Sequence, residues 1–291
     1  MKKLGVHLVD EKDADVCVLG VLLGKASRKS VETIREQSWH VEFFDVDRNK
    51  NLFELLKIAD LGDIEVKKHT DITNRVAGIL KERKLPFLLG GNHQLSLYAL
   101  KAFKKMPRLI IFDAHTDIYD SYMDEKVADS VFGLPMSEKE KEKENCATWV
   151  RRFIELSSSN NVAYFGIRSA EEDAMKFMLD NSVAYFTPKM LRKNPLAAKR
   201  FLSEFTRGQE VYVTVDIDFF DPAVAPAVYH PEPNGHTFPE FQELLSAIEG
   251  RIVGADVVEL KPIPENFVTE FLAIKVIFEM FGKINDQVQK E

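Results

Sequence analysis

The chain has 291 residues, of which 45% are hydrophobic and 29% are charged, as in an ordinary soluble globular protein. Its net charge of −7 argues against nucleic acid or an anionic membrane surface as the main partner. The sequence contains no run of about 18 apolar residues, so no membrane span is predicted. It has no apolar segment near its start, so no signal peptide is predicted. The only two cysteines, Cys17 and Cys146, favour a reducing compartment, and we expect a cytoplasmic protein.

Short apolar, β-branched runs alternate with longer amphipathic stretches along the chain. Strands are predicted over 16–23, 40–46, 86–89, 109–112, 162–167, 183–186, 211–215 and 252–259. Helices are predicted over 30–37, 52–58, 71–83, 94–104, 148–156, 171–179, 196–205, 239–247 and 266–281. Nearly continuous apolar strands that alternate with helices are typical of a parallel sheet covered on both faces. We therefore predict a three-layer α/β/α fold with about eight parallel strands, in which residues 1–291 form a single domain.

The segment 137–145 reads SEKEKEKEN and is the one low-complexity stretch of the chain. Alternating charges of this kind usually mark a solvated face, so we predict a solvated loop or a short exposed helix. The rest of the sequence contains no internal repeat and no linker composition.

Three clusters of acidic and imidazole side chains each follow a predicted strand. They are GGNH at 90–93, DAHTD at 113–117 and DIDFFDP at 216–222. In parallel sheets, binding sites form outside the carboxyl ends of the strands, so we expect the clusters to meet. If the strand that ends at Phe112 stayed extended, alternation would place Asp113, His115 and Asp117 on one face.

Together the clusters offer six candidate metal ligands: His93, Asp113, His115, Asp117, Asp216 and Asp218. Buried charges are costly unless a cation binds them, and oxygen-rich ligand sets of this kind suit Mn²⁺. In two-metal sites a carboxylate usually bridges ions about 3.5–4 Å apart. A single Asp-x-His-x-Asp could be a turn with capping side chains, but three clusters at separate strand ends favour a hydrolase with two metal ions.

A competing interpretation rests on Gly91-Asn92-His93, which resembles the Gly-Asn-His element of metallophosphoesterases. In that class an Asp-x-His precedes the Gly-Asn-His, whereas here it follows. The cluster from Asp216 to Asp221 also has no counterpart in that scheme. We therefore disfavour a phosphatase.

At these same residues the chain resembles the ureohydrolase family, which includes arginases, agmatinases and formiminoglutamases. The family pattern is Gly-Gly-x-His, then Asp-Ala-His-x-Asp, then Asp-x-Asp-x-x-Asp-Pro-x-x-Ala-Pro. Residues 216–226 read DIDFFDPAVAP and match the last element in full, and residues 256–259 resemble the family's Asp-Val-Val-Glu. Weaker similarities lie at 59–63 and 166–169, so the resemblance covers roughly residues 15–281.

The resemblance implies two Mn²⁺ ions per subunit. One would be held by His93, Asp113, Asp117 and Asp216, and the other by Asp113, His115, Asp216 and Asp218. Ions in this arrangement lower the pKa of a bridging water, and the resulting hydroxide would attack the central carbon of a guanidinium or amidine. The products would be an amine plus urea or formamide.

The resemblance also implies catalytic roles for two carboxylates, Glu259 and Asp117. Glu259 would bind the planar substrate cation, because forked N–H donors fit a carboxylate bidentately. Asp117 would pass a proton from the hydroxide to the leaving amine. Asp221, before Pro222, is expected to fix its loop, and Arg168 to organise loops nearby. Family members commonly form trimers or hexamers, so a homo-oligomer is expected.

Three departures from the family pattern concern the surroundings of the metals. Phe132 stands where many members carry a proton-shuttling histidine, and Lys261 stands where the family often has asparagine. The loop at 227–236 is bulkier than the usual glycine-rich loop and is stiffened by prolines. We hypothesise that His230 from this loop enters the site and takes over the shuttle role; a structural or exposed histidine is the alternative.

The GIRS stretch at 166–169 leans toward agmatinase, whereas the GGNHQ stretch at 90–94 and the missing shuttle histidine lean toward formiminoglutamase. We expect an agmatinase-like hydrolase of a linear guanidine or amidine. A formiminoglutamase-like or arginase-like hydrolase is the alternative within the family, with arginase ranked last. A family member that binds metal without turnover is the alternative of another class. The tail of the substrate is expected to be selected by the loops at 118–130 and 227–236.

Overall fold

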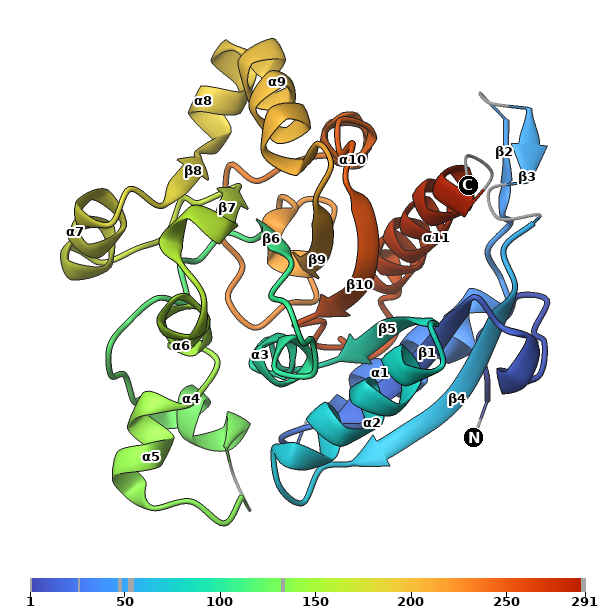
Figure 1. Cartoon of the computed structure of the whole chain (residues 1–291), viewed down its shortest axis with the longest axis horizontal. Coiled ribbons are helices and arrows are strands. Elements are labelled where there is room, and N and C mark those ends of the chain that lie inside the picture. The colour runs from blue at the N-terminus through green and yellow to red at the C-terminus, as the bar shows by residue number, and fades with distance from the viewer. Residues whose placement is uncertain (1, 26, 47–48, 52–54, 132–133, 289–291) are drawn as a thin grey trace.

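The computed structural model describes residues 2–25, 27–46, 49–51, 55–131 and 134–288 (Figure 1). Eight strands form one sheet in the order β4-β1-β5-β10-β9-β6-β7-β8, and every neighbouring pair is parallel. Their bounds are β1 (Val16–Leu22), β4 (Ile58–Glu65), β5 (Leu85–Gly90), β6 (Arg108–Phe112), β7 (Val162–Phe165), β8 (Ala184–Phe186), β9 (Glu210–Asp216) and β10 (Arg251–Val258).

Helices cover both faces of this sheet. One face packs against α1 (Ser27–Ser38), α8 (Pro188–Lys193), α9 (Pro195–Thr206), α10 (Phe238–Ser246) and α11 (Val268–Val288). The other packs against α2 (Thr70–Lys81), α3 (Leu95–Leu100), α6 (Trp149–Leu156) and α7 (Glu172–Asp180). Strand residues alternate between the two buried clusters, as Val18 and Leu19 do in β1. The predicted three-layer α/β/α fold is confirmed, whereas the single-domain organisation stays a prediction.

One predicted strand and one predicted helix are wrong. Within 40–46 only β2 (Phe44–Asp45) is extended, and it pairs antiparallel with β3 (Lys50–Asn51), outside the main sheet. The eighth strand of the main sheet is β4, which begins at Ile58, where the sequence predicts the end of a helix over 52–58. Residues 52–54 lie outside the described part, and residues 55–57 are not helical.

The acidic residues of β4 explain why periodicity missed this strand. Asp60 and Asp63 interrupt its apolar pattern, yet the side chains of both are buried. Arg35 of α1 pairs with both, and its Nε lies 2.9 Å from Asp60 Oδ2. Burying a charge is tolerable when it is paired, so a tertiary contact stabilises a strand that its local sequence disfavours.

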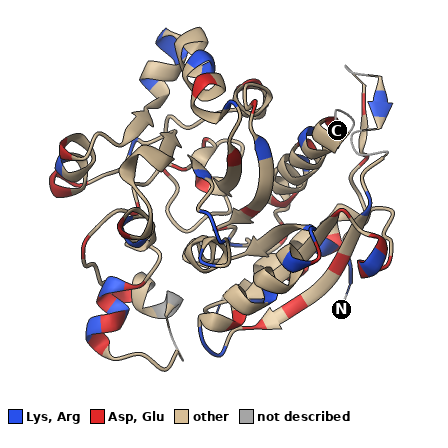
Figure 2. Cartoon of the chain, viewed as in Figure 1, with Lys and Arg blue, Asp and Glu red and all other residues tan. Residues whose placement is uncertain are grey.

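The remaining predicted helices are present with shifted ends, and α11 runs on to Val288. The short helices α4 (Glu125–Ser130) and α8 were not predicted. The charged segment forms α5 (Glu138–Lys143), an exposed helix whose alternating charges are visible in Figure 2. Ser137 begins it with a capping box, because its Oγ accepts from Glu140 N at 3.3 Å. Among the described residues, no helix is long and apolar enough to cross a membrane.

The strand order determines where functional side chains can gather. β5, β10, β9 and β6 are consecutive in the middle of the sheet, although they are far apart in sequence. Their carboxyl ends lead directly into the three predicted clusters and into Glu259. The predicted site therefore lies at the carboxyl ends of the central strands, where open α/β sheets bind ligands.

Candidate metal centre

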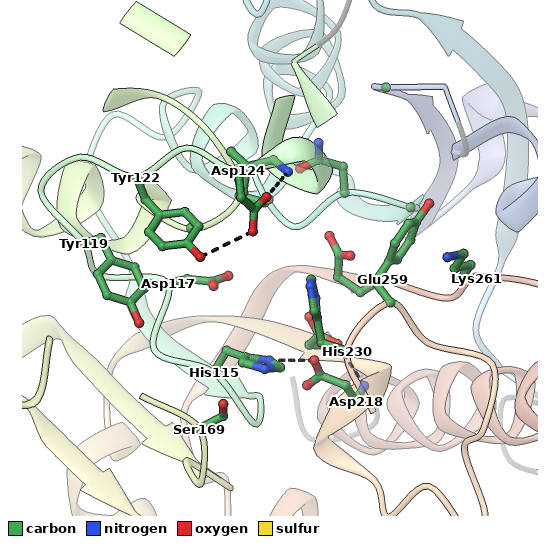
Figure 3. Close-up of a pocket in the computed structure, with 18 of the residues that line it drawn as sticks. His115, Asp117, Tyr119, Tyr122, Asp124, Ser169, Asp218, His230, Glu259 and Lys261 are labelled. Atoms are coloured by element: carbon green, nitrogen blue, oxygen red, sulfur yellow. Dashed lines mark hydrogen bonds and ion pairs between the residues drawn. The ribbon is translucent and has the colours of Figure 1, made fainter. Parts of the chain in front are cut away.

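A cavity of about 530 Å³ opens at the carboxyl ends of these four strands. Four of the candidate ligands line it together with Glu259 and His230, namely His115, Asp117, Asp216 and Asp218 (Figure 3). The other two, His93 and Asp113, are not part of the lining but lie within 4 Å of these ligands. His93 reaches the site from the segment after β5, and Asp113 comes directly after β6. Asp216 is the last residue of β9, and Asp218 lies in the short turn that follows.

The first group of side chains surrounds one nitrogen of His93. Its Nδ1 lies 3.1 Å from Asp113 Oδ2 and 3.3 Å from an oxygen of both Asp117 and Asp216. His93 Nδ1 and Asp113 Oδ2 are buried, and neither has a hydrogen bond of acceptable geometry within the described residues. Buried polar atoms without a partner are rare and costly, so a cation held between them would satisfy both.

The second group shares Asp113 with the first. His115 Nδ1 lies 2.8 Å from Asp218 Oδ2 and 3.7 Å from Asp113 Oδ1. The ligand atoms of His93, Asp113 and Asp216 lie within 4.8 Å of one another, and so do those of Asp113, His115 and Asp218. One carboxylate common to two groups is what a pair of neighbouring ions requires. A second bridge through Asp216 and a ligand role for Asp117 stay predictions.

The pKa values of this cluster show how strongly its charges repel. Burial, followed by the charges of Asp218 and Asp117, raises the pKa of Asp113 to about 7. Burial also raises the pKa of Asp216 well above its usual range. Burial lowers the pKa of His115, but Asp218 outweighs it and the pKa reaches about 10. Without a metal, retained protons reduce the repulsion between the crowded carboxylates. Divalent cations would neutralise the same negative charge.

The side chains do not converge through alternation along an extended strand, as the residue spacing predicts. β6 ends at Phe112, so residues 113–117 are not an extended strand. Asp117 has a left-handed backbone with φ of 47°, and its Oδ2 accepts a hydrogen bond from Trp149 Nε1 at 2.9 Å. Asp218 lies in a 3-10 turn in which its N–H donates to Asp216 Oδ1 at 2.8 Å. Irregular segments after the strands, not a continued extended strand, bring these side chains close together, and their roles as metal ligands stay predictions.

The glycine pair before His93 includes a position, Gly91, that has no room for a side chain. Neither Gly90 nor Gly91 has a positive φ, so no left-handed turn is present there. A Cβ on Gly91 would lie 2.8 Å from the backbone Cα of Ser27. Gly91 therefore permits the close approach of the β5 end to the start of α1.

Glu259 follows β10 and lines the cavity beside the metal groups. Its backbone is left-handed with φ of 63°, and its Oε1 accepts a hydrogen bond from His93 N at 2.6 Å. Burial raises the pKa of Glu259 to about 8. It belongs to neither metal group, and its role as an unligated carboxylate stays a prediction.

His230 lines the cavity, with its ring centroid 5.6 Å from that of His115, but it is also exposed to solvent, as the alternative interpretation expects. Lys261 also lines the cavity, with its Nζ 5.0 Å from the ring centroid of Tyr229. Phe132 lies outside the described residues. The shuttle role of His230 stays a prediction.

Arg168 and Asp221 organise the surrounding loops. The guanidinium of Arg168 donates to backbone carbonyls at both ends of the 218–233 segment, including Asp218 O at 2.6 Å and Glu232 O at 2.9 Å. Asp221 accepts from Ala223 N at 3.0 Å and from Gly235 N at 2.9 Å. Both residues therefore have the structural role expected of them.

Two residues beside His93 were not predicted from the sequence. Trp149 places its ring 4.7 Å from the ring of His93, and Thr214 Oγ1 lies 2.9 Å from His93 Nε2. Thr214 could have been found, because it lies two residues before Asp216 and faces the same side of β9. Trp149 comes from α6, and no local pattern links it to the metal ligands.

Known proteins are similar to this chain over most of its length. A model of the arginase family matches residues 15–282. The agmatinase of Bacillus subtilis (strain 168) is 33% identical over 270 residues, 87% of this chain and 84% of that protein. The mitochondrial arginase of Medicago truncatula is 28% identical over 294 residues, 92% of this chain and 81% of that protein. The structure of agmatine ureohydrolase of Thermoplasma volcanium matches with a TM-score of 0.84 and 25% identity, over 100% of this chain and 97% of that chain. The chain therefore belongs to the arginase family.

Proposed function

We propose that this protein is a binuclear manganese hydrolase that cleaves a C–N bond of a linear guanidine or amidine. An agmatinase-like reaction, which releases urea and an amine, is the leading form. The observation that carries the proposal is the pair of ligand groups that share Asp113, with Glu259 beside them in one cavity. Arginase-family members are hydrolases of C–N bonds, which supports the reaction class.

Two Mn²⁺ ions would be held by the six candidate ligands. His93, Asp113, Asp117 and Asp216 would bind one ion, and Asp113, His115, Asp216 and Asp218 the other. Divalent cations, when bound, lower the pKa of a coordinated water and so supply a nucleophile near neutral pH. Four carboxylates balance the charge of two such ions, and the oxygen-rich set favours manganese over thiolate-preferring metals.

Glu259 would bind and orient the substrate. A guanidinium is planar and offers forked N–H donors, and a carboxylate accepts two of them side by side. The bond from His93 N restricts Glu259 to one orientation, so little freedom remains to be lost when the substrate binds. The pKa of about 8 falls when a cation approaches, because a positive charge favours the ionised carboxylate.

Proton transfer would involve Asp117 and His230. The leaving amine must gain a proton, and Asp117 is placed among the ligands with one oxygen bound by Trp149. His230 lies in the same cavity near His115 and would exchange protons between the site and solvent.

The walls of the cavity favour a positively charged substrate tail. Asp124 and Glu171 line it together with Tyr119 and Tyr122, whose rings stack with centroids 5.1 Å apart. Figure 3 shows both tyrosines on the side of Asp117. Aromatic faces and carboxylates together bind ammonium groups, which supports the agmatinase-like form.

A formiminoglutamase-like reaction is the second candidate, and one observation favours it. Lys25 and Lys261 line the same cavity, and Lys261 follows Glu259 closely in the chain. Ammonium groups there would bind the carboxylates of an acidic tail. An arginase-like substrate or a family member without turnover ranks below both.

The function is tested by metal analysis followed by assays of urea and amine release. Purified protein is expected to hold two Mn²⁺ per chain and to turn over agmatine faster than guanidinobutyrate, arginine or formiminoglutamate. Glu259→Gln should retain both metals while kcat/KM falls by at least about 100-fold, as when a preorganised transition-state contact is removed. Two bound metals with no turnover on any of these compounds would favour the non-catalytic alternative.

The expected homo-oligomer and cytoplasmic location remain parts of this proposal. Light scattering after size-exclusion chromatography would separate a trimer or hexamer from a single chain of 33.2 kDa.

A further inference from the structure

The loop between β6 and α6 passes the cavity twice. Its outgoing stretch, 119–124, and its returning stretch, 144–147, both contribute residues to the cavity lining. Between them lies α5, which consists only of charged residues, none of them buried. Because α5 contributes no buried apolar side chain, polar contacts decide where this wall of the cavity lies.

Asn145 is a fully buried residue at the base of this loop. Its Nδ2 lies 2.8 Å from Tyr122 O, 2.7 Å from Lys141 O and 3.2 Å from Glu142 O. Its Oδ1 accepts a hydrogen bond from Ala147 N at 3.0 Å. One amide group therefore contacts the outgoing stretch, the last turn of α5 and the returning stretch together.

These contacts require the donors of an amide. The two hydrogens on Nδ2 serve the carbonyl oxygens, whereas a carboxylate of the same size offers only acceptors. The carbonyls of a last helical turn have no partner inside the helix, and α5 has only six residues. Solvent cannot replace the donors, because the side chain of Asn145 is buried, so their loss would leave buried carbonyls unsatisfied.

The same contacts hold Tyr122 from both sides of its backbone. Its N–H donates to Glu142 O at 2.9 Å, and its C=O accepts from Asn145. Its ring stacks against Tyr119, and its hydroxyl donates to Asp124 Oδ2 at 3.3 Å. Asn145 therefore determines the position of an aromatic and acidic wall, although it does not line the cavity itself.

We propose that Asn145 is a positioning residue that determines specificity, because it holds Tyr122 and its wall where the tail of the substrate binds. The inference rests on the proposed function, in which Glu259 binds the guanidinium. Figure 3 shows Tyr119 and Tyr122 on the far side of Asp117 from Glu259, so a substrate held by Glu259 would extend toward them. Aromatic faces and a carboxylate attract an ammonium group, so loss of the amide weakens binding of an amine tail and leaves the reaction at the metals unchanged.

Kinetics of Asn145→Asp on two substrates test this, measured as release of urea at saturating Mn²⁺. The variant keeps the size and the Oδ1 acceptor but loses both donors. KM for agmatine should rise by about 10-fold, as expected for one or two contacts to an ammonium group, while kcat changes by less than about threefold. Butylguanidine has the same carbon chain without the amine, so its KM should change much less.

Trypsin supplies a measurement that does not depend on turnover. Local opening exposes peptide bonds to protease, and α5 carries three lysines, Lys139, Lys141 and Lys143. Cleavage at these lysines, followed by mass spectrometry, should be about 10-fold faster in Asn145→Asp than in the wild type.

Asn285→Asp is the matched control, because this buried asparagine of α11 accepts from Leu55 N at 3.2 Å through its Oδ1 and does not line the cavity. It should leave KM and the cleavage of α5 unchanged. Wild-type KM for agmatine, or wild-type cleavage of α5, in folded Asn145→Asp would overturn the proposal. If that variant does not fold, Asn145→Ser, whose side chain is too short to join both stretches, decides in its place. If agmatine binds without turnover, its Kd from calorimetry replaces KM, and only the proposed function fails.

Discussion

Two residues of the site, Asp117 and Glu259, adopt left-handed backbone conformations that non-glycine residues seldom adopt. The side chain of each accepts a hydrogen bond, from Trp149 Nε1 in Asp117 and from His93 N in Glu259. Conformations of this kind cost about 1–3 kcal/mol each and persist where the surrounding structure enforces them, often at functional sites. These two carboxylates are also the ones to which we assign substrate binding and proton transfer.

The contact from Trp149 to Asp117 yields a test at the residue scale. Trp149→Phe keeps an aromatic ring beside His93 but removes the donor, and a hydrogen bond to a charged group is worth about 1.5–3 kcal/mol. We expect kcat to fall by about 10–100-fold, measured as urea release at saturating Mn²⁺. The control is Trp39→Phe at the other tryptophan, which is 61% exposed and should leave kcat unchanged. Unchanged kcat in Trp149→Phe would show that the hydrogen bond from Trp149 does not support catalysis.

His230 gives a second test at this scale. His230→Ala should lower kcat on the true substrate by about 100-fold or more if the imidazole moves protons, as general acid–base groups do. Its effect should be largest at low buffer concentration, and added imidazole should restore part of the rate. His40→Ala, at an exposed histidine, is the control. Wild-type turnover of His230→Ala would end the shuttle hypothesis.

At the scale of elements, the site depends on how closely the end of β5 approaches α1. Gly91 has no room for a side chain because the backbone of Ser27 lies against it. The same segment carries His93, whose Nδ1 faces the ligand group and whose N–H holds Glu259. Packing between a strand end and a helix start therefore determines the position of both a metal ligand and the substrate carboxylate.

Gly91→Ala is expected to disturb this packing. The added Cβ meets backbone, which cannot move cheaply, so the free energy of unfolding should fall by about 1–3 kcal/mol in urea titrations. Mn²⁺ affinity should fall as well, because His93 lies two residues away. The control is Gly78→Ala in α2, where a Cβ meets nothing within 4 Å and stability should rise by about 0.5–1 kcal/mol. A Gly91→Ala protein as stable as wild type would contradict the packing argument.

The elements that the sequence failed to predict share a physical cause. β4 carries buried Asp60 and Asp63, whose charges are acceptable only because Arg35 of a distant helix pairs with them. A local pattern contains no information about such a partner, so the sequence predicts no strand over 58–65. α4 and α8 have six residues each, too few to establish a helical period.

For the whole molecule, the buried cluster makes stability depend on pH and on metal. The pKa of Asp113 is raised to about 7 and that of Glu259 to about 8, so the folded chain retains protons that the unfolded chain loses near pH 4. The pKa of His115 is raised to about 10, so the folded chain also keeps this proton longer. Since the folded state binds more protons in each case, these groups lower the free energy of unfolding as pH rises.

We therefore expect the metal-free protein to become less stable between about pH 5 and about pH 9, whereas Mn²⁺ should abolish most of this loss by replacing the protons. Urea titrations with excess EDTA and with excess Mn²⁺ measure the difference, which should widen as pH rises. A tenfold difference in proton affinity between the folded and unfolded chain corresponds to about 1.4 kcal/mol, so the trend is resolvable. Equal pH dependence with and without Mn²⁺ would contradict a metal site at this cluster.

The sequence by itself determined the parallel α/β fold and the residues of the candidate metal centre. Apolar period and strand-end position are local properties, and parallel strands bring their carboxyl ends together in any order. Only the tertiary structure decided that β10 and β9 lie between β5 and β6, which places Glu259 beside the ligands. It likewise decided the contacts of Trp149, Thr214 and Asn145, because hydrogen bonds between distant segments depend on packing and leave no period in the chain.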